Sequence, residues 1–169
     1  MKKYLLDTNI YIDAYDRYYR NEYFPTYWEK FSVILNEHVI IPKVVKDEIT
    51  KSDWFLDWLK NNYQDDILNH RNYSPQWQTI LDFVQSSGLY KDEALTKQTT
   101  GWANDTIADP WIVAIAKENN LVIVTNEERV PNLGKGTPIK SVRIPDICDR
   151  QGVRCISRND FFGEIGLQV

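Results

Sequence analysis

The chain has few of the residues that build thiol–metal sites or disulfide frameworks. Its 169 residues include only two cysteines, Cys148 and Cys155, which lie seven positions apart with no CxxC motif and no neighbouring histidine pair. This excludes a typical zinc site and a disulfide framework, so we expect two inert reduced thiols, with a redox role as the alternative. The two histidines, His38 and His70, have no companion with which to form a metal site or a general-base pair, and neither is assigned a role.

Long apolar runs and glycine-rich turns are also missing. No apolar segment approaches the roughly 18 residues of a membrane-spanning helix, and Met1-Lys2-Lys3 leads into a predicted strand rather than a signal peptide. We therefore expect no membrane association and a cytoplasmic protein. No Gly-rich turn follows the first predicted strand, which argues against a nucleotide-binding Rossmann module. The length predicts a single domain spanning 1–169.

An overall excess of positive charge is absent as well. The formal net charge is −4, which argues against a protein that coats nucleic acid over its whole surface but allows a local basic patch. Residues 129–158, the basic segment, hold seven Lys and Arg against two Asp, a local charge of +5 that leaves −9 for the remainder. Such a segment is typical of a phosphate-contacting face, and a solvated surface explains it equally well.

The sequence does contain an alternation of short apolar segments and helical patterns. Short apolar segments predict strands, and apolar residues three and four positions apart predict helices. The predicted strands are 3–6, 39–41, 121–125, 139–144 and 153–156, and the predicted helices are 10–19 capped by Asn9, 24–37, 43–49, 53–63, 75–86, 109–118 and a final short helix capped by 157–160. This order indicates an α/β fold with a mostly parallel sheet, to which 51–105 add a helical insertion or lobe.

Four acidic residues stand where these predicted elements end or turn. Asp7 and Glu127 follow strands, Glu48 lies on the second turn of a short helix, and Asp109 opens a longer helix. In an open α/β sheet, functional sites form at the carboxyl ends of parallel strands, so we expect these carboxylates to be gathered there. Oxygen ligands of this kind suit Mg²⁺ or Mn²⁺.

This acidic set predicts metal-assisted hydrolysis of a phosphodiester. A divalent cation relieves the repulsion among crowded carboxylates, activates water and stabilises the attacking and leaving oxygens. Asp7 is expected to be the central ligand, flanked by Glu48 and Asp109, with the fourth acid binding directly or through water. Thr125 and Asn9 are expected to orient carboxylates or contact a phosphate. Taken singly, each acid is more simply explained as a helix cap, a turn former or a solvated charge than as a metal ligand. The spacing of the four acids alone favours neither these roles nor a shared metal site.

Four segments of the chain resemble a known family. They are Leu5-Leu6-Asp7-Thr8-Asn9, Val44-Val45-Lys46-Asp47-Glu48-Ile49, Ala108-Asp109-Pro110-Trp111-Ile112-Val113-Ala114-Ile115-Ala116 and Val122-Ile123-Val124-Thr125-Asn126-Glu127. Their order, distances and context resemble the PIN-domain ribonucleases, including VapC-like toxins. The segment Arg143-Ile144-Pro145-Asp146-Ile147-Cys148, with Gly152-Val153 and Phe161-Phe162, resembles one PIN-like subfamily formerly of unknown function. The resemblance covers essentially the whole chain and is weakest over 51–105.

The resemblance implies a three-layer α/β/α fold, dependence on Mg²⁺ or Mn²⁺, and endonucleolytic cleavage of RNA. It further implies the toxin of a type II toxin–antitoxin system, an antitoxin partner and a possible homodimer. Thr125 matches the polar residue after the fourth strand of the family. Glu127 stands where most of the family has Asp, and Glu128 is adjacent, so the identity of the fourth ligand is open. The residues that match the three core acidic ligands are Asp7, Glu48 and Asp109.

Candidate RNA contacts lie on two segments. Lys43 and Lys46 share the short helix of Glu48, where a solvated helix face is the simpler explanation, and Lys140 and Arg143 belong to the basic segment. Seven of the ten tyrosines fall within the first 27 residues. Those on the first predicted helix are expected mainly to pack against the core, with a partner surface or base stacking as alternatives.

Two other functional classes compete with a nuclease. A non-catalytic PIN-like module that binds RNA or protein fits the Glu at 127 and the net acidity. A phosphatase of the haloacid dehalogenase type needs a second Asp two residues after its nucleophile, where this chain has Asn9, and this argues against it. RNA cleavage by the pure protein separates the binding module from the nuclease.

Overall fold

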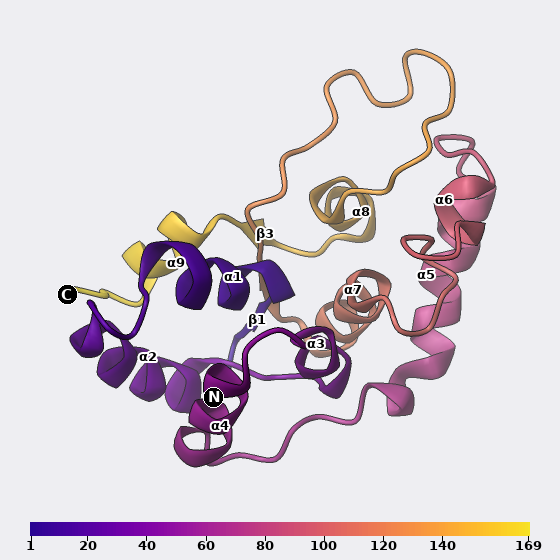
Figure 1. Ribbon diagram of the computed structural model, residues 1–169. Helices are drawn as coiled ribbons and strands as arrows, with labels where there is room; N and C mark the ends of the chain where they lie inside the picture. The colour runs from indigo at the N-terminus through magenta and orange to yellow at the C-terminus, as the bar shows by residue number, and fades with distance from the viewer.

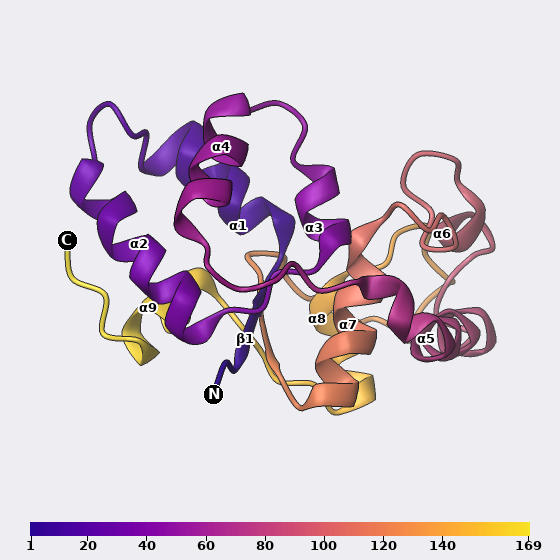
Figure 2. The ribbon, with the colours of Figure 1, turned by 90° about the horizontal axis from the view of Figure 1, so that it is seen from below.

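The computed structural model describes all 169 residues as a mixed α/β structure around a small parallel sheet with the strand order β1-β2-β3. In Figures 1 and 2, α1, α2, α4 and α9 lie on one side of the strands and α5, α6, α7 and α8 on the other. The elements are β1 Tyr4–Leu6, α1 Thr8–Asp13, a π-helical turn Ala14–Tyr18, α2 Pro25–His38, α3 Lys43–Glu48, α4 Asp53–Asn62, a 3-10 turn His70–Tyr73, α5 Ser74–Ser86, α6 Glu93–Thr96, α7 Ala108–Asn119, β2 Val122–Val124, α8 Ile144–Gln151, β3 Cys155–Ile156 and α9 Arg158–Glu164.

The register of the sheet places two polar residues side by side at its carboxyl edge. Leu6 of β1 pairs with Val124 of β2, and both neighbouring strand pairs are parallel. The Asp7 main-chain N–H donates to the Val124 carbonyl at 2.9 Å, so Asp7 extends the pairing by one residue. Because Thr125 directly follows β2, its side chain lies next to that of Asp7 at this edge.

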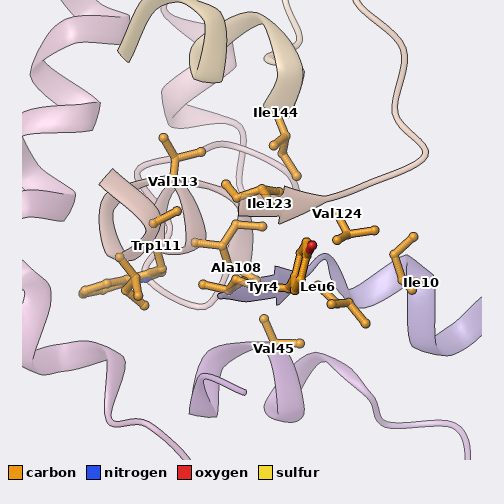
Figure 3. Packing of buried hydrophobic residues seen from close by; sticks show 14 of the residues in the cluster. Tyr4, Leu6, Ile10, Val45, Ala108, Trp111, Val113, Ile123, Val124 and Ile144 are labelled. Carbon is orange, nitrogen blue, oxygen red and sulfur yellow. The ribbon is translucent and has the colours of Figure 1, made fainter. Parts of the chain in front are cut away.

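The core is a single cluster of 41 buried hydrophobic residues that runs through the sheet and the helices around it. The β1 and β2 residues are all buried, which explains why these strands are continuous apolar runs rather than alternating patterns. Figure 3 shows members of the cluster drawn from several elements, including Leu6, Ile10, Val45, Ala108, Trp111, Val124 and Ile144.

The helices of 51–105 divide between the two sides of the sheet. Trp54 and Trp58 of α4 each place their rings 4.9 Å from Trp28 of α2. Trp77 of α5 instead stacks on Trp111 of α7 with ring centroids 4.8 Å apart. These aromatic contacts tie both helices to the rest of the core.

Two predicted strands are corrected by the structure. The segment 39–41 makes one isolated bridge, from Val39 to Tyr4, and Pro42 after it bridges to Leu68. No continuous ladder forms in the short connection between α2, which ends at His38, and α3, which begins at Lys43. The segment 139–144 makes only one bridge, from Ile139 to Tyr90, and it ends in a helix that the sequence analysis did not predict. Ile144 and Pro145 form the first turn of α8, where proline is tolerated because its missing N–H has no helical partner.

The predicted cap of the first helix is also wrong. Helix α1 begins at Thr8, so Asn9 lies in its first turn, and Asp7 occupies the capping position without a side-chain capping bond. Asp7 has extended backbone angles because it continues β1, and its carboxylate is engaged elsewhere.

Other local predictions are confirmed. The last helix begins with a capping box in which Ser157 and Asp160 exchange hydrogen bonds. Tyr11 is buried, and Tyr15 stacks on Phe55 with ring centroids 5.1 Å apart, in agreement with a packing role for these tyrosines. Among the helices, none combines the length and the apolar character needed to cross a membrane.

Candidate functional site

The structure brings the four singled-out acids to one cavity of about 510 Å³, which we call the acidic cavity. Five carboxylates line it, and no Lys, Arg or His does. Its lining residues are Asp7, Thr8, Asn9, Ile12, Asp47, Glu48, Thr100, Thr106, Ile107, Asp109 and Glu127. Negative charge is therefore concentrated among the lining residues; the cations that offset part of it, Lys43 beside Asp47 at 2.6 Å and Arg143 near Glu127, lie outside the lining.

Asp7 is held at the carboxyl edge of the sheet by its neighbour on β2. Its side chain is only 3% exposed, and its Oδ2 accepts a hydrogen bond from the Thr125 hydroxyl at 2.9 Å. The same hydroxyl oxygen accepts from the Glu127 main-chain N–H at 3.1 Å. Thr125 thus links the side chain of Asp7 to the main chain of Glu127.

Glu48 is the last residue of α3, and both of its oxygens are engaged. Oε1 accepts from the Thr8 hydroxyl at 2.5 Å, and Oε2 accepts from the Ala108 main-chain N–H at 3.1 Å. The second bond uses one of the free N–H groups at the start of α7, so the carboxylate stabilises that helix terminus. Sequence reasoning missed Thr8, although its position beside Asp7 was a signal.

Asp109 lies in the first turn of α7, where the helix dipole favours a negative charge. In contrast to the other three acids, it accepts no hydrogen bond from the protein. It is therefore the one acid of the four that no protein hydrogen bond holds in place.

Glu127 reaches the acidic cavity from the loop after β2. Its Oε2 accepts from the Ile144 main-chain N–H at 2.8 Å, which fixes it against the start of α8. Glu128 is exposed and does not line the acidic cavity, although it lines a neighbouring one together with Glu127. The position of the fourth acid in the acidic cavity therefore belongs to Glu127.

Burial and mutual repulsion raise the pKa values of these acids. Burial first, and then the charge of Glu127, raise the pKa of Asp7 to about 7, against the opposing effect of the Thr125 hydrogen bond. Burial, together with nearby Asp7, Glu127 and Glu48, raises the pKa of Asp109 well above its ordinary value. The pKa values of Glu48 and Glu127 are raised mainly by burial and are held back by the hydrogen bonds they accept. Near neutral pH the cavity therefore holds protons that isolated carboxylates would release.

The chemistry of the donors fits a hard divalent cation. All candidate ligands are carboxylate oxygens, which Mg²⁺ and Mn²⁺ prefer, and no cation is among the residues that line the cavity. As the side chains stand, no three His, Cys, Asp or Glu are arranged to hold a metal ion. The fit to a divalent cation therefore rests on three properties of the donors: they are carboxylates, they are buried, and they repel one another.

The remaining wall of the acidic cavity comes from residues 97–107, where a close backbone approach requires glycine. A Cβ on Gly101 would lie 2.3 Å from the Leu95 carbonyl oxygen and 2.5 Å from that of Lys97. The Trp111 indole donates to the Asp105 carbonyl at 3.0 Å, which ties this wall to α7. Thr100, Thr106 and Ile107 are thereby placed on the cavity, a role that the irregular sequence of this region did not reveal.

The other predicted site residues lie in different places. Asn9 is exposed on the rim of the acidic cavity and makes no hydrogen bond to the acids. Lys43 and Lys46 line a second, adjoining cavity. Lys140 pairs with Glu93 at 3.4 Å, and Arg143 is exposed just before α8; neither lines the two cavities.

Fold and site together define a mixed α/β protein with an acidic cavity at the carboxyl edge of a parallel sheet. The chain belongs to the family described as a domain of unknown function, DUF4411, whose model matches residues 4–169. No curated protein matches the chain. Because the family description names no activity, the function has to be inferred from the chemistry of the acidic cavity.

Proposed function

We propose that this protein is an Mg²⁺- or Mn²⁺-dependent endoribonuclease with a PIN-like fold, acting as the toxin of a toxin–antitoxin pair. The observation that carries the proposal is the acidic cavity, where five carboxylates and no Lys, Arg or His line one recess. Buried like charges raise one another's pKa values and destabilise the empty protein. Perturbed groups of this kind concentrate at functional sites, where a ligand offsets their charge.

The arrangement of the elements supports the PIN-like part of the proposal. Helices lie on both sides of the parallel sheet, in agreement with a three-layer α/β/α organisation (Figures 1 and 2). Asp7 follows β1 and Glu127 follows β2, at the strand ends where sites form in such sheets. The order of the four acids along the chain is that of the PIN-domain ribonucleases, and the RNA substrate, the toxin role and the antitoxin partner are inferred from the same resemblance.

The chain's own residues prepare the site for hydrolysis of a phosphodiester. A bound divalent cation would lower the pKa of a water molecule and offset the charge on the phosphodiester oxygens. The Thr125 and Thr8 hydroxyls orient the carboxylates of Asp7 and Glu48 before any ligand arrives. Asp109, with no protein hydrogen bond, can adjust its position. The residues that would hold the ion are Asp7, Glu48, Asp109 and Glu127.

The test is cleavage of total and transfer RNA by the purified protein in Mg²⁺ or Mn²⁺. We expect discrete fragments that disappear in EDTA and in Asp7→Asn and Asp109→Asn. The loss should be at least roughly 100-fold, since even the indirect partners of metal ligands are worth about 10–100-fold. Asp57→Asn, an exposed position on α4, is the matched control and should cleave like the wild type. Circular dichroism verifies that each variant is folded.

Different outcomes separate the competing functions. Undiminished cleavage in both Asp7→Asn and Asp109→Asn would overturn the assignment of the site. RNA that is bound but left intact, by a protein that shows no Mn²⁺ binding in calorimetry, would identify the non-catalytic binding module. The toxin role is tested by expression in growing bacteria, which we expect to arrest growth with the wild type and not with Asp109→Asn.

A further inference from the structure

A second cavity of about 630 Å³ adjoins the acidic cavity, and the two share Asp47 and Thr106 as a common wall. We call it the basic cavity, because three cations and two carboxylates line it, whereas five carboxylates and no cation line the first. Its lining residues are Lys43, Val44, Lys46, Asp47, Ile67, Asn69, His70, Arg71, Asp105 and Thr106. The sign of the charge thus changes across a single shared wall.

The cations of the basic cavity are available to a ligand. Lys43 pairs with Asp47 at 2.6 Å and Arg71 pairs with Asp105 at 3.3 Å, but all four side chains are largely exposed. Exposed ion pairs of this kind contribute only about 0–1 kcal/mol, so an anion with a higher charge density can displace the carboxylates. Lys46 is partly buried and has no carboxylate partner.

The walls of the basic cavity are fixed by main-chain hydrogen bonds. The Lys43 N–H donates to the Leu68 carbonyl at 2.8 Å, and the Leu68 N–H donates to the Ile41 carbonyl at 2.9 Å. The Asn69 side chain accepts from the Arg71 N–H at 3.1 Å and so sets the position of this arginine.

His70, in the same turn, anchors this wall to the core. It is 5% exposed, and its ring packs edge-on against Trp111 with centroids 4.7 Å apart. Its Nδ1 is buried without a hydrogen-bond partner. The basic cavity is therefore a built recess rather than a chance gathering of surface lysines.

We infer that the basic cavity binds a backbone phosphate of the RNA strand whose scissile phosphodiester lies in the acidic cavity. This inference rests on the proposed endoribonuclease function. Lys46 and Arg71 supply the charge-assisted hydrogen bonds that phosphate oxygens accept, and the shared wall at Asp47 and Thr106 lets one strand occupy both cavities. The acidic cavity repels RNA when no cation is bound, so the basic cavity provides the attraction that holds the strand.

The composition of the basic cavity also predicts what it does not recognise. No Phe, Tyr or Trp lines it, so bases have no exposed aromatic ring on which to stack. Contacts to phosphates carry no sequence information. We therefore expect this cavity to contribute salt-dependent affinity for any single strand, without sequence preference.

The test measures binding separately from cleavage. Fluorescence polarisation of a labelled single-stranded RNA is recorded in the Asp109→Asn background without divalent ions, over a range of salt concentrations. Lys46→Ala and Arg71→Ala should each weaken binding by roughly 5- to 10-fold and reduce the slope of log affinity against log salt by about 0.7, the value for one phosphate contact on a single strand. Lys46→Arg should restore most of the affinity.

Matched controls and contrary results are available in the same assay. Lys60→Ala, an exposed lysine of α4, and Arg20→Ala, an exposed arginine that pairs with Glu22, should bind like the background protein. Equal affinities and salt slopes for Lys46→Ala, Arg71→Ala and these controls would overturn the inference, as would the absence of RNA binding altogether. If binding follows the expected pattern but the active protein cuts no RNA, the proposed nuclease function fails and the basic cavity stands.

In the cleaving protein, Lys46→Ala should raise KM for RNA and leave kcat nearly unchanged, because the contact is uniform in ground and transition states. A fall in kcat at constant KM would instead place Lys46 in the chemistry and contradict a binding role.

Discussion

In the acidic cavity five carboxylates meet with no cation among the lining residues, whereas in the basic segment 129–158 three of the seven cations form ion pairs. Arg129 makes a two-pronged ion pair with Asp149, with its Nε 2.7 Å and its Nη2 2.9 Å from the carboxylate oxygens. Lys140 pairs with Glu93, and Arg154 pairs with Glu164. Two of these partners lie outside the segment, so its sequence charge of +5 is reduced once the chain folds.

This contrast shows that a candidate site differs from an ordinary surface in whether its charges are paired, and not in how many charges it holds. Asp47 pairs with Lys43, but Asp7, Glu48 and Glu127 are held by neutral donors, namely the Thr8 and Thr125 hydroxyls and main-chain N–H groups. Such donors orient a carboxylate without neutralising it, and so preserve its attraction for a cation. Exposed ion pairs neutralise charge but contribute little energy, which is the behaviour of an ordinary surface. That Lys140 and Arg143 contact RNA stays a prediction.

After the Asp7 and Asp109 variants, the largest expected effect also lies within the acidic cavity. Glu127→Gln keeps an acceptor for the Ile144 N–H but removes the charge, and we expect RNA cleavage to fall by roughly 10- to 100-fold, as for other perturbed metal-site partners. Glu128→Gln should leave cleavage unchanged, because Glu128 is exposed and lies outside the cavity. Initial cleavage rates in Mn²⁺ compare the two. The reverse ranking would move the fourth acid to position 128.

A pH series of thermal unfolding measures how much the buried charge of Asp7 destabilises the protein. The folded-state pKa of Asp7, about 7, lies above its ordinary value of 3.8, so the folded protein binds a proton more tightly than the unfolded chain does. Wild-type stability in EDTA should therefore fall as pH rises from about 4 to about 7, with the full destabilisation present above that range. Asp7→Asn removes this destabilisation, so the variant should melt several degrees above the wild type at pH 8 and at nearly the same temperature at pH 4. For a protein of this size, a change of 1 kcal/mol in stability shifts the melting temperature by about 2–4 °C.

Addition of Mn²⁺ at pH 8 provides the control for that series. Ions that bind the folded state alone stabilise it, so the wild type should gain more from Mn²⁺ than Asp7→Asn does. A melting-temperature difference that is the same at pH 4 and pH 8 would show that Asp7 does not carry the electrostatic cost.

The smallest expected effect lies in the basic segment. Arg129→Ala removes an exposed ion pair and should destabilise the protein by less than about 1 kcal/mol, with RNA affinity and cleavage unchanged. Urea unfolding and the polarisation assay measure both quantities, and Asp149→Asn is the matched partner variant. A loss of RNA affinity as large as that of Lys46→Ala would break the comparison, because it would make Arg129 a phosphate contact despite its partner.

Local features of the fold could be read from the sequence, and features that depend on distant pairing could not. The apolar periodicity of 24–37 predicted α2, and the capping segment 157–160 predicted α9, because both patterns act within a few turns of the chain. The segment 139–144 has apolar residues suited to a strand, but only Ile139 finds a partner, Tyr90, and Ile144 starts a helix. Whether an apolar segment becomes a strand depends on a neighbouring backbone, which no local pattern contains.

The candidate site likewise has features that could be read from the sequence and features that could not. The order and spacing of Asp7, Glu48 and Asp109 singled them out in the sequence, since each stands at the start or end of a predicted element. The choice of Glu127 over Glu128 depends on the N–H of Ile144, which lies on α8.

By itself, then, the sequence determined an α/β chain, its main helices and a set of acids at strand and helix ends, because these follow from short-range periodicity and chain direction. Only the tertiary structure decided that Thr8 holds Glu48, that residues 97–107 form the wall of the acidic cavity, and that Lys46 and Arg71 line an adjoining recess. These relations join residues far apart in the chain, and they arise from packing and main-chain hydrogen bonds that exist only after the elements come together.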